Sequence, residues 1–371
     1  MDEAAERRAL TGLRGAAALY VALYHLFRSV YGDVPALGVP WLGGFVLRGY
    51  FAVDLFFVLS GFVMAMAYGG WFAGAWSART YLTFVARRIA RLWPLHAAVL
   101  CALLAAHAAS GTWRVWPWLI AANLLLVQAW GLSVSLNVPS WSVSTEAAAY
   151  LLFPLLSAVA LRGGPARRLA ALLAAAVALA AVVHLAPEGG AERHGRLDIY
   201  ANYSILPLLR CLAGFTVGLL AHGVAGAWPF RPWHAASALA VLLAGLAAGV
   251  DDLALYPLLP VLVAALASGR GGVARVLAAP ALHWLGRVSY ALYLVHVPVL
   301  DAARAVAGAD WPALRAGWPG AVLAGLLALS LGVAWVAHRT VEVPGRRGLR
   351  TLASRAGLGH GRMRAAGSGG A

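Results

Sequence analysis

His25 and two carboxylates lie inside apolar segments of this chain, and side chains of these types can carry proton-transfer chemistry. His25 lies near the end of the run GLRGAAALYVALYHLF, residues 12–27. Asp54 lies in FAVDLFFVLSGFVM and Glu146 in SWSVSTEAAAYLLFP. An imidazole acts as a general base when a carboxylate fixes its tautomer and stabilises the cation that forms. These three residues are candidates for a catalytic group with His25 as the base.

Three arginines form a second candidate group, which suits an anion. Arg14 shares the first apolar run with His25, and their separation is three helical turns plus about 20°, or roughly 16 Å along the axis. The two side chains are therefore expected on one face of a helix. Arg88 and Arg91 follow in RRIARLWPLH, three residues apart and so on one side of a helix. Guanidinium groups bind phosphate oxygens in a bidentate way, and we expect these arginines to bind phosphate.

Each group also has a purely structural interpretation. The histidine and the carboxylates could hold helices together through buried hydrogen bonds, and the arginines could set membrane orientation and contact lipid head groups. For Arg87 we expect only the latter role, whereas Arg14 lies deeper in its apolar run than orientation requires. No metal site is expected, because Cys101 and Cys211 lie far apart in apolar runs.

Membrane-spanning helices must position these groups. Of the 371 residues, 62% are hydrophobic and 12% are charged, which is too apolar for a soluble globular chain. Apolar windows of about 20 residues, enough to cross a ~30 Å hydrocarbon core, recur along the whole chain. We predict an all-α, multi-pass protein of the cell's inner (plasma) membrane with about ten transmembrane helices. They are expected near residues 10–31, 45–69, 92–110, 140–161, 169–186, 204–222, 234–250, 253–269, 284–306 and 319–338. In these spans His25, Asp54 and Glu146 are expected at similar depth.

The arginines set the expected topology. The net charge is +15, but the basic residues fall in short loops between apolar runs, so no nucleic-acid partner is expected. If the apolar piece at 116–130 does not cross the membrane, most arginines lie on one side, as the positive-inside rule requires. We therefore predict a short re-entrant or interfacial segment there, and both termini in the cytoplasm. Residues 1–342 form one membrane domain, and residues 343–371 a basic tail expected to be disordered on anionic lipid.

Five motifs, in this order, make the chain resemble the acyltransferase 3 family of integral membrane O-acyltransferases. They are RALTGLRGAAALYVALYHLF, FFVLSGFVM, RRIARLWP, PSWSVSTEAAAYLLFP and LGRVSYALYLVHVP. The fourth motif carries Trp141 together with Glu146, and the fifth carries Ser289, Tyr293 and His296. The resemblance runs over nearly the whole chain and implies an enzyme.

The resemblance implies transfer of an acyl group, often acetyl, from a coenzyme A thioester to a sugar hydroxyl of a surface glycan or to a natural product. It implies that Arg14, Arg88 and Arg91 hold the coenzyme A phosphates at the cytoplasmic mouth of a groove. The pantetheine arm then reaches His25, which takes the proton of the acceptor hydroxyl directly or through an acyl intermediate. Glu146 is expected to orient His25, with Asp54 in support.

The acceptor is expected to contact Trp141, Ser289, Tyr293 and His296. His296 could line the acceptor channel, donate to the developing oxyanion, or only hydrogen-bond a neighbouring hydroxyl. The polar loop 188–204 lies on the expected outer side. The bias toward alanine and arginine, with no lysine, is typical of a GC-rich bacterial genome, where a macrolide is as credible an acceptor as a polysaccharide.

A secondary transporter, or an acyl-carrier permease, with an intramembrane histidine and carboxylate site is the alternative. Such a protein should show internal repeats with Gly or Pro breaks at matching places in two halves. We find no convincing repeat. Another superfamily of membrane acyltransferases also uses a buried histidine, but its characteristic pairing lies late in the chain, and here the strongest constellation is in the first 150 residues. Acyl transfer to a hydroxyl is therefore the preferred hypothesis.

Overall fold

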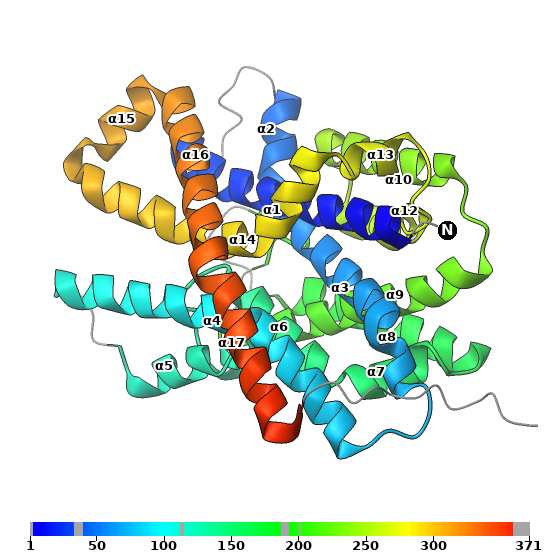
Figure 1. The fold of residues 1–371 in the computed structure, drawn as a ribbon. Helices are drawn as coiled ribbons and strands as arrows, with labels where there is room; N and C mark the ends of the chain where they lie inside the picture. Colours follow the sequence, from blue (N-terminus) through cyan, green and yellow to red (C-terminus); the bar gives the residue numbers. More distant parts are fainter. Residues whose placement is uncertain (1–2, 33–39, 112–114, 187–192, 200–201, 359–371) are drawn as a thin grey trace, which may run out of the picture.

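The computed structural model describes residues 3–32, 40–111, 115–186, 193–199 and 202–358, and over these residues the protein contains helices and no strands (Figure 1). The all-α prediction is confirmed for this part of the chain. The helices are α1 (Glu3–Tyr31), α2 (Pro40–Leu47), α3 (Ala52–Tyr68), α4 (Ala78–Ser110), α5 (Pro117–Leu124), α6 (Ser140–Leu151), α7 (Phe153–Ala160), α8 (Pro165–Leu185), α9 (Leu206–Ala227), α10 (Pro232–Ala248), α11 (Asp252–Leu255), α12 (Leu258–Leu266), α13 (Gly272–Leu277), α14 (Pro280–Ala307), α15 (Trp311–Gly317), α16 (Pro319–Ala337) and α17 (Val343–Ala353).

The apolar helices are those of a polytopic membrane protein. In the described residues, six helical stretches are long and apolar enough to cross a membrane, and the bent pair α6 and α7 makes a seventh if it is one span. The predicted number of ten is not confirmed. The expected spans at 234–250 and 253–269 correspond to α10 and to α11 with α12. These are apolar but shorter than the helices counted above. The side of the membrane on which the termini lie stays a prediction.

The segment at 116–130 contains only a short helix. The eight residues of α5 rise about 12 Å, well below the ~30 Å of a hydrocarbon core. A π-helical turn with non-helical residues, Gln128–Leu132, follows it. This shape fits the predicted segment that does not cross.

Helices α1 and α14 pack with their backbones in direct contact. A Cβ atom added to Gly15 would lie 2.5 Å from the backbone nitrogen of Gly286, and one added to Gly286 would lie 2.0 Å from the carbonyl oxygen of Thr11. Only glycine leaves room for such an approach. Arg14 of α1 contacts Ser289 of α14, and further along both helices His25 contacts His296. The two helices therefore run parallel. This helix pair carries most of the candidate site.

The chain after residue 342 continues as a helix. Figure 1 shows α16 and α17 as one rod that runs past α4, joined by the π-helical turn η5 (His338–Glu342). Disorder was expected from residue 343 because of the Gly- and Arg-rich composition, but the described part of this tail is helical. The reason is packing that composition does not reveal: a Cβ atom on Gly345 would lie 2.5 Å from Cβ of Pro94 in α4. Residues 359–371 of the expected tail lie outside the described residues.

Candidate active site

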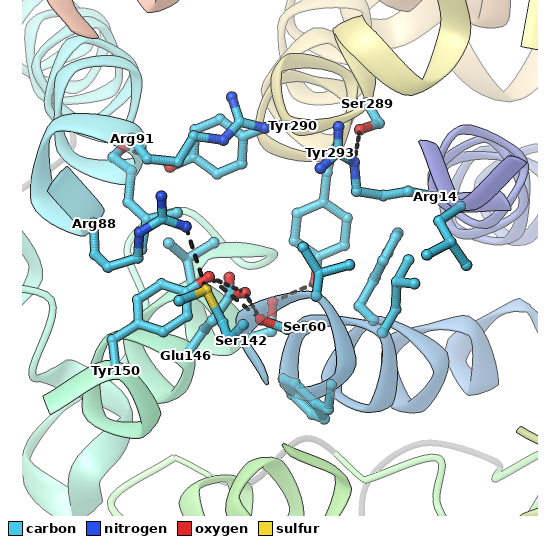
Figure 2. A pocket seen from close by; sticks show the side chains of 18 of the residues that line it. Arg14, Ser60, Arg88, Arg91, Ser142, Glu146, Tyr150, Ser289, Tyr290 and Tyr293 are labelled. Atoms are coloured by element: carbon cyan, nitrogen blue, oxygen red, sulfur yellow. Dashed lines mark hydrogen bonds between the residues drawn. The ribbon is translucent and has the colours of Figure 1, made fainter. Parts of the chain in front are cut away.

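A cavity of about 510 Å³ lies among α1, α3, α4, α6 and α14 (Figure 2). Helix α1 supplies Arg14, α4 supplies Arg88 and Arg91, and α6 supplies Glu146. Apolar residues of α3 make up much of the remaining wall. The three arginines that the sequence groups together therefore share one cavity, and a carboxylate shares it with them.

Arg14 enters the cavity from α1 and is held by α14. Its Nε atom donates to Oγ of Ser289 at 3.1 Å, and Nη2 donates to the carbonyl oxygen of Gly286 at 2.8 Å. The Ser289 hydroxyl donates to the same carbonyl oxygen at 2.8 Å. Within the described residues no carboxylate forms an ion pair with Arg14. Its guanidinium is oriented by neutral groups, and its charge is available to an anion.

Arg88 and Arg91 lie one turn apart on α4 and have different surroundings. Arg88 donates through Nη2 to the hydroxyl of Tyr68 at 2.9 Å, and its guanidinium lies over the rings of Tyr68 and Tyr150. In the part of the chain that the structure describes, Arg88 has no carboxylate partner. Arg91 forms an ion pair with Glu342 of the π-helical turn η5. One of the three positive charges is thus already compensated by the protein.

Glu146 faces this cavity and not His25. Its Oε1 atom accepts hydrogen bonds from Oγ of Ser60 and from the hydroxyl of Tyr150, each at 2.5 Å. Ser60 comes from α3, and Tyr150 is one helical turn further along α6 (Figure 2). The expectation that Glu146 orients His25 is therefore wrong for this structure. Two residues at the same depth need not face each other, because each helix can be rotated differently about its axis.

His25 of α1 is held by a contact with His296 of α14. Its Nδ1 atom lies 3.1 Å from Nε2 of His296 and 3.1 Å from the carbonyl oxygen of Val21. Nδ1 of His296 lies 3.1 Å from the carbonyl oxygen of Leu292. Carbonyl oxygens only accept, so in a neutral pair the Nδ1 atom of each ring carries the proton. The single Nδ1 proton of His25 is then shared between the carbonyl oxygen of Val21 and Nε2 of His296, and Nε2 of His25 keeps a lone pair.

Tyr293 stands between the arginine cavity and the imidazole pair. Its hydroxyl shares a hydrogen bond with Oγ of Ser142 at 2.7 Å, and both residues line the cavity. The same ring lies 6.0 Å, between centroids, from the ring of His296. Arg14 and His25 do contact the same neighbouring helix, as their spacing predicts. The cavity that holds Arg14, however, has Tyr293 in its wall and does not include His25.

Asp54 is bound by an arginine that the sequence analysis did not consider. Nε and Nη2 of Arg210 donate to its two carboxylate oxygens at 2.9 and 2.5 Å, and both side chains are buried. Asp54 is therefore not a partner of His25. The ring of Trp141, expected to contact the acceptor, lies against Arg210 outside the cavity lining. Arg210 interrupts the apolar run LPLLRCLAGF, and asking which carboxylate compensates it would have predicted this pair.

Both predicted carboxylates are thus occupied by other partners. Among the described residues, no three histidine, cysteine, aspartate or glutamate side chains lie close enough together to hold a metal ion. Near the end of α14, Arg304 and Asp301 form an exposed ion pair with 3.9 Å between their side chains.

The loop that contains residues 193–199 lies next to His25. Oδ1 of Asp198 accepts a hydrogen bond from the hydroxyl of Tyr24 at 3.2 Å, and this hydroxyl also accepts one from Arg28 at 3.1 Å. The Tyr24 ring packs edge-on against His25 with 4.7 Å between centroids. Burial raises the pKa of the Asp198 carboxyl. A polar group of this loop therefore reaches the tyrosine that packs on His25.

A family profile and two known proteins match this chain. Residues 7–339 match the profile of a family described as acyltransferase domain. The chain is 33% identical over 371 residues to acyltransferase MdmB of Streptomyces mycarofaciens, and the match covers 90% of each chain. It is 40% identical over 98 residues to protein 2 in the picA locus of Rhizobium radiobacter, which is 26% of this chain and 44% of that protein. No solved structure matches.

Proposed function

This chain belongs to the acyltransferase family and is a membrane-embedded transferase, and we propose that it moves an acyl group from acyl-coenzyme A to a hydroxyl. The acyl group is acetyl in the simplest case. The acceptor is a sugar of a surface glycan or a natural product such as a macrolide, and the enzyme works in the inner membrane. The observation that carries the proposal is the 3.1 Å contact between His25 and His296, directly beyond the tyrosine that closes the arginine cavity.

The arginine cavity is the proposed donor site. Coenzyme A is a polyanion, and two guanidinium groups here, those of Arg14 and Arg88, have no carboxylate partner among the described residues. Guanidinium binds phosphate oxygens through two parallel hydrogen bonds. Arg91 is held in place by Glu342, which leaves it one face for a ligand. The apolar wall formed by α3 suits the pantetheine arm.

His25 is the proposed general base. Its Nε2 atom takes the proton of the acceptor hydroxyl as that oxygen attacks the thioester carbonyl. The tetrahedral intermediate collapses and expels the thiolate, which takes the proton from the imidazolium and leaves as the free thiol. His296 is a positioning residue, because its Nε2 atom accepts from Nδ1 of His25 and orients the ring, while the carbonyl oxygen of Val21 favours the tautomer that bears the Nε2 lone pair.

Donor and acceptor approach from opposite sides in this scheme. The thioester arm must pass Tyr293, and movement of the Tyr293 ring, which breaks the hydrogen bond to Ser142, opens the path. The acceptor enters on the side of the loop that carries Asp198, next to Tyr24. Glu146 then belongs to the donor side, where it orients Tyr150 and Ser60.

The test is transfer of label from radioactive acetyl-coenzyme A to a panel of glycan and macrolide acceptors in membranes that contain the protein. We expect label in at least one acceptor, and loss of this transfer in His25→Ala with the protein still folded. His184→Ala serves as the matched control, because that histidine is exposed on α8. Full turnover by His25→Ala would reject the base. Label in no acceptor, with formation of a solute gradient instead, would favour a transporter.

A further inference from the structure

A second, smaller cavity lies between α4 and the C-terminal helix α17. Its volume is about 190 Å³, and its polar lining comes from Tyr68, Arg87, Arg350 and Ser354. No carboxylate is among the described residues that line it. The guanidinium of Arg87 is held over the ring of Trp71, 4.6 Å from the centroid. The cavity is therefore a basic pocket with one pre-oriented cation.

Tyr68 connects this basic pocket to the arginine cavity. The residue lines the basic pocket, and its hydroxyl accepts the hydrogen bond of Arg88, which lines the arginine cavity. Arg87 and Arg88, consecutive on α4, thus serve different cavities. The two cavities are therefore neighbours along α4, linked by the hydrogen bond from Arg88 to Tyr68.

Helix α17 is held on α4 at both of its ends. At its start, Glu342 pairs with Arg91, and Gly345 contacts Pro94. Beyond its end, Nε of Arg79 donates to the carbonyl oxygen of Gly357 at 2.9 Å. Arg350 lies between these attachments and is presented to the basic pocket. The family match ends at residue 339, so this arginine comes from a segment outside the matched domain.

We propose that the basic pocket binds a phosphate group of the donor's nucleotide end, with Arg87 and Arg350 as its ligands. The inference rests on the proposed function, since it assumes a coenzyme A donor. The nucleotide end carries three phosphates, whereas Glu342 already compensates one of the three arginines of the main cavity. The guanidinium of Arg350 adds positive charge beside that cavity, in a pocket that Arg87 also lines. A phospholipid head group presents the same phosphate chemistry, and the experiment separates these two sources.

Direct binding of adenosine 3′,5′-bisphosphate tests the site without any need for turnover. The full chain is placed in nanodiscs of phosphatidylcholine alone, and the Kd is measured by calorimetry for the wild type, Arg350→Gln and Arg350→Lys. A lost charge-assisted hydrogen bond corresponds to about tenfold or more in Kd. We expect that weakening for Arg350→Gln and a smaller one for Arg350→Lys. Arg347→Gln is the matched control on the same helix, because Arg347 does not line the pocket; its Kd should stay within about twofold.

Donor length provides the second readout. For Arg350→Gln, the ratio of kcat/KM with acetyl-coenzyme A to kcat/KM with acetyl-pantetheine, which lacks the nucleotide, should fall about tenfold. An unchanged Kd and an unchanged ratio would overturn the proposal. The proposal would also be overturned if adenosine 3′,5′-bisphosphate did not bind in phosphatidylcholine nanodiscs while the retention of phosphatidylglycerol depended on Arg350. The pocket would then be a lipid site. Nucleotide binding without any acyl transfer would support this site and reject the proposed function.

Discussion

The Nε2 atom of His296 lies 3.1 Å from the Nδ1 atom of His25, so the histidine of α1 is oriented by a second imidazole and not by a carboxylate. An imidazole nitrogen can donate or accept, so His296 orients the ring while the carbonyl oxygens of Val21 and Leu292 favour the tautomers, and it compensates the imidazolium less than a carboxylate does. The contact joins α1 to α14 at the level of Tyr293, where the proposed donor path ends.

Replacement of His296 should lower kcat, by an amount that depends on whether the new side chain can accept the hydrogen bond from Nδ1 of His25. In His296→Leu, Nδ1 of His25 loses its partner on α14, and we expect kcat to fall by about 10- to 100-fold, part of the 10²- to 10⁴-fold that a positioned base contributes. His296→Asn offers an amide oxygen and should recover part of the rate. Acetyl transfer under saturating donor and acceptor measures this. Equal rates for the Leu and Asn variants would show that His296 does not act through this hydrogen bond.

The buried pair of Asp54 and Arg210 should control stability. Asp54→Asn leaves the Arg210 cation uncompensated in the interior, and we expect a loss of about 3–5 kcal/mol. Thermal unfolding in detergent checks this, with the double variant Asp54→Leu, Arg210→Met expected to regain most of the loss. Asp301→Asn is the control, because its pair with Arg304 is exposed and worth at most about 1 kcal/mol. A stable Asp54→Asn protein that lacks activity would instead place Asp54 in the chemistry.

Removal of the hydrogen bond between Tyr293 and Ser142 should open the donor path and increase hydrolysis of the donor. A net hydrogen bond of about 1 kcal/mol holds Tyr293 closed, so Tyr293→Phe and Ser142→Ala should each raise the open population about fivefold. We expect a similar rise in the hydrolysis of acetyl-coenzyme A when no acceptor is present. Tyr290→Phe is the control, because that hydroxyl donates to the carbonyl oxygen of Leu92 at 2.6 Å and not to Ser142. Unchanged hydrolysis in the first two variants would contradict the gate.

The contact of α1 with α14 should tolerate no side chain at Gly286. A Cβ atom there would lie 2.0 Å from the carbonyl oxygen of Thr11, so the helices must separate and His25 must move away from His296. Gly286→Ala should cost about 1–3 kcal/mol and lower transfer as well. Gly332→Ala on α16 is the matched control, because nothing lies within 4 Å of its added Cβ atom. Equal melting temperatures for the two variants would refute the close approach.

Several features of the site follow from the order of residues within single helices. The eleven-residue spacing of Arg14 and His25 predicts a shared face, and both side chains do contact α14. The spacing of Arg88 and Arg91 predicts a shared cavity, and they share one. Composition alone indicates a helical membrane protein. Each of these inferences uses only helical periodicity or apolar length, which are local properties.

Contacts between helices could not be predicted in the same way. Glu146 and Asp54 were expected beside His25 from their depth, but the rotation of each helix about its axis turned them toward Ser60 and Arg210. The same packing brought His296 to His25. It also seated α17 on α4, although its composition favours disorder. Periodicity states which residues of one helix share a face, whereas the partner of that face is decided by close packing of all the helices together.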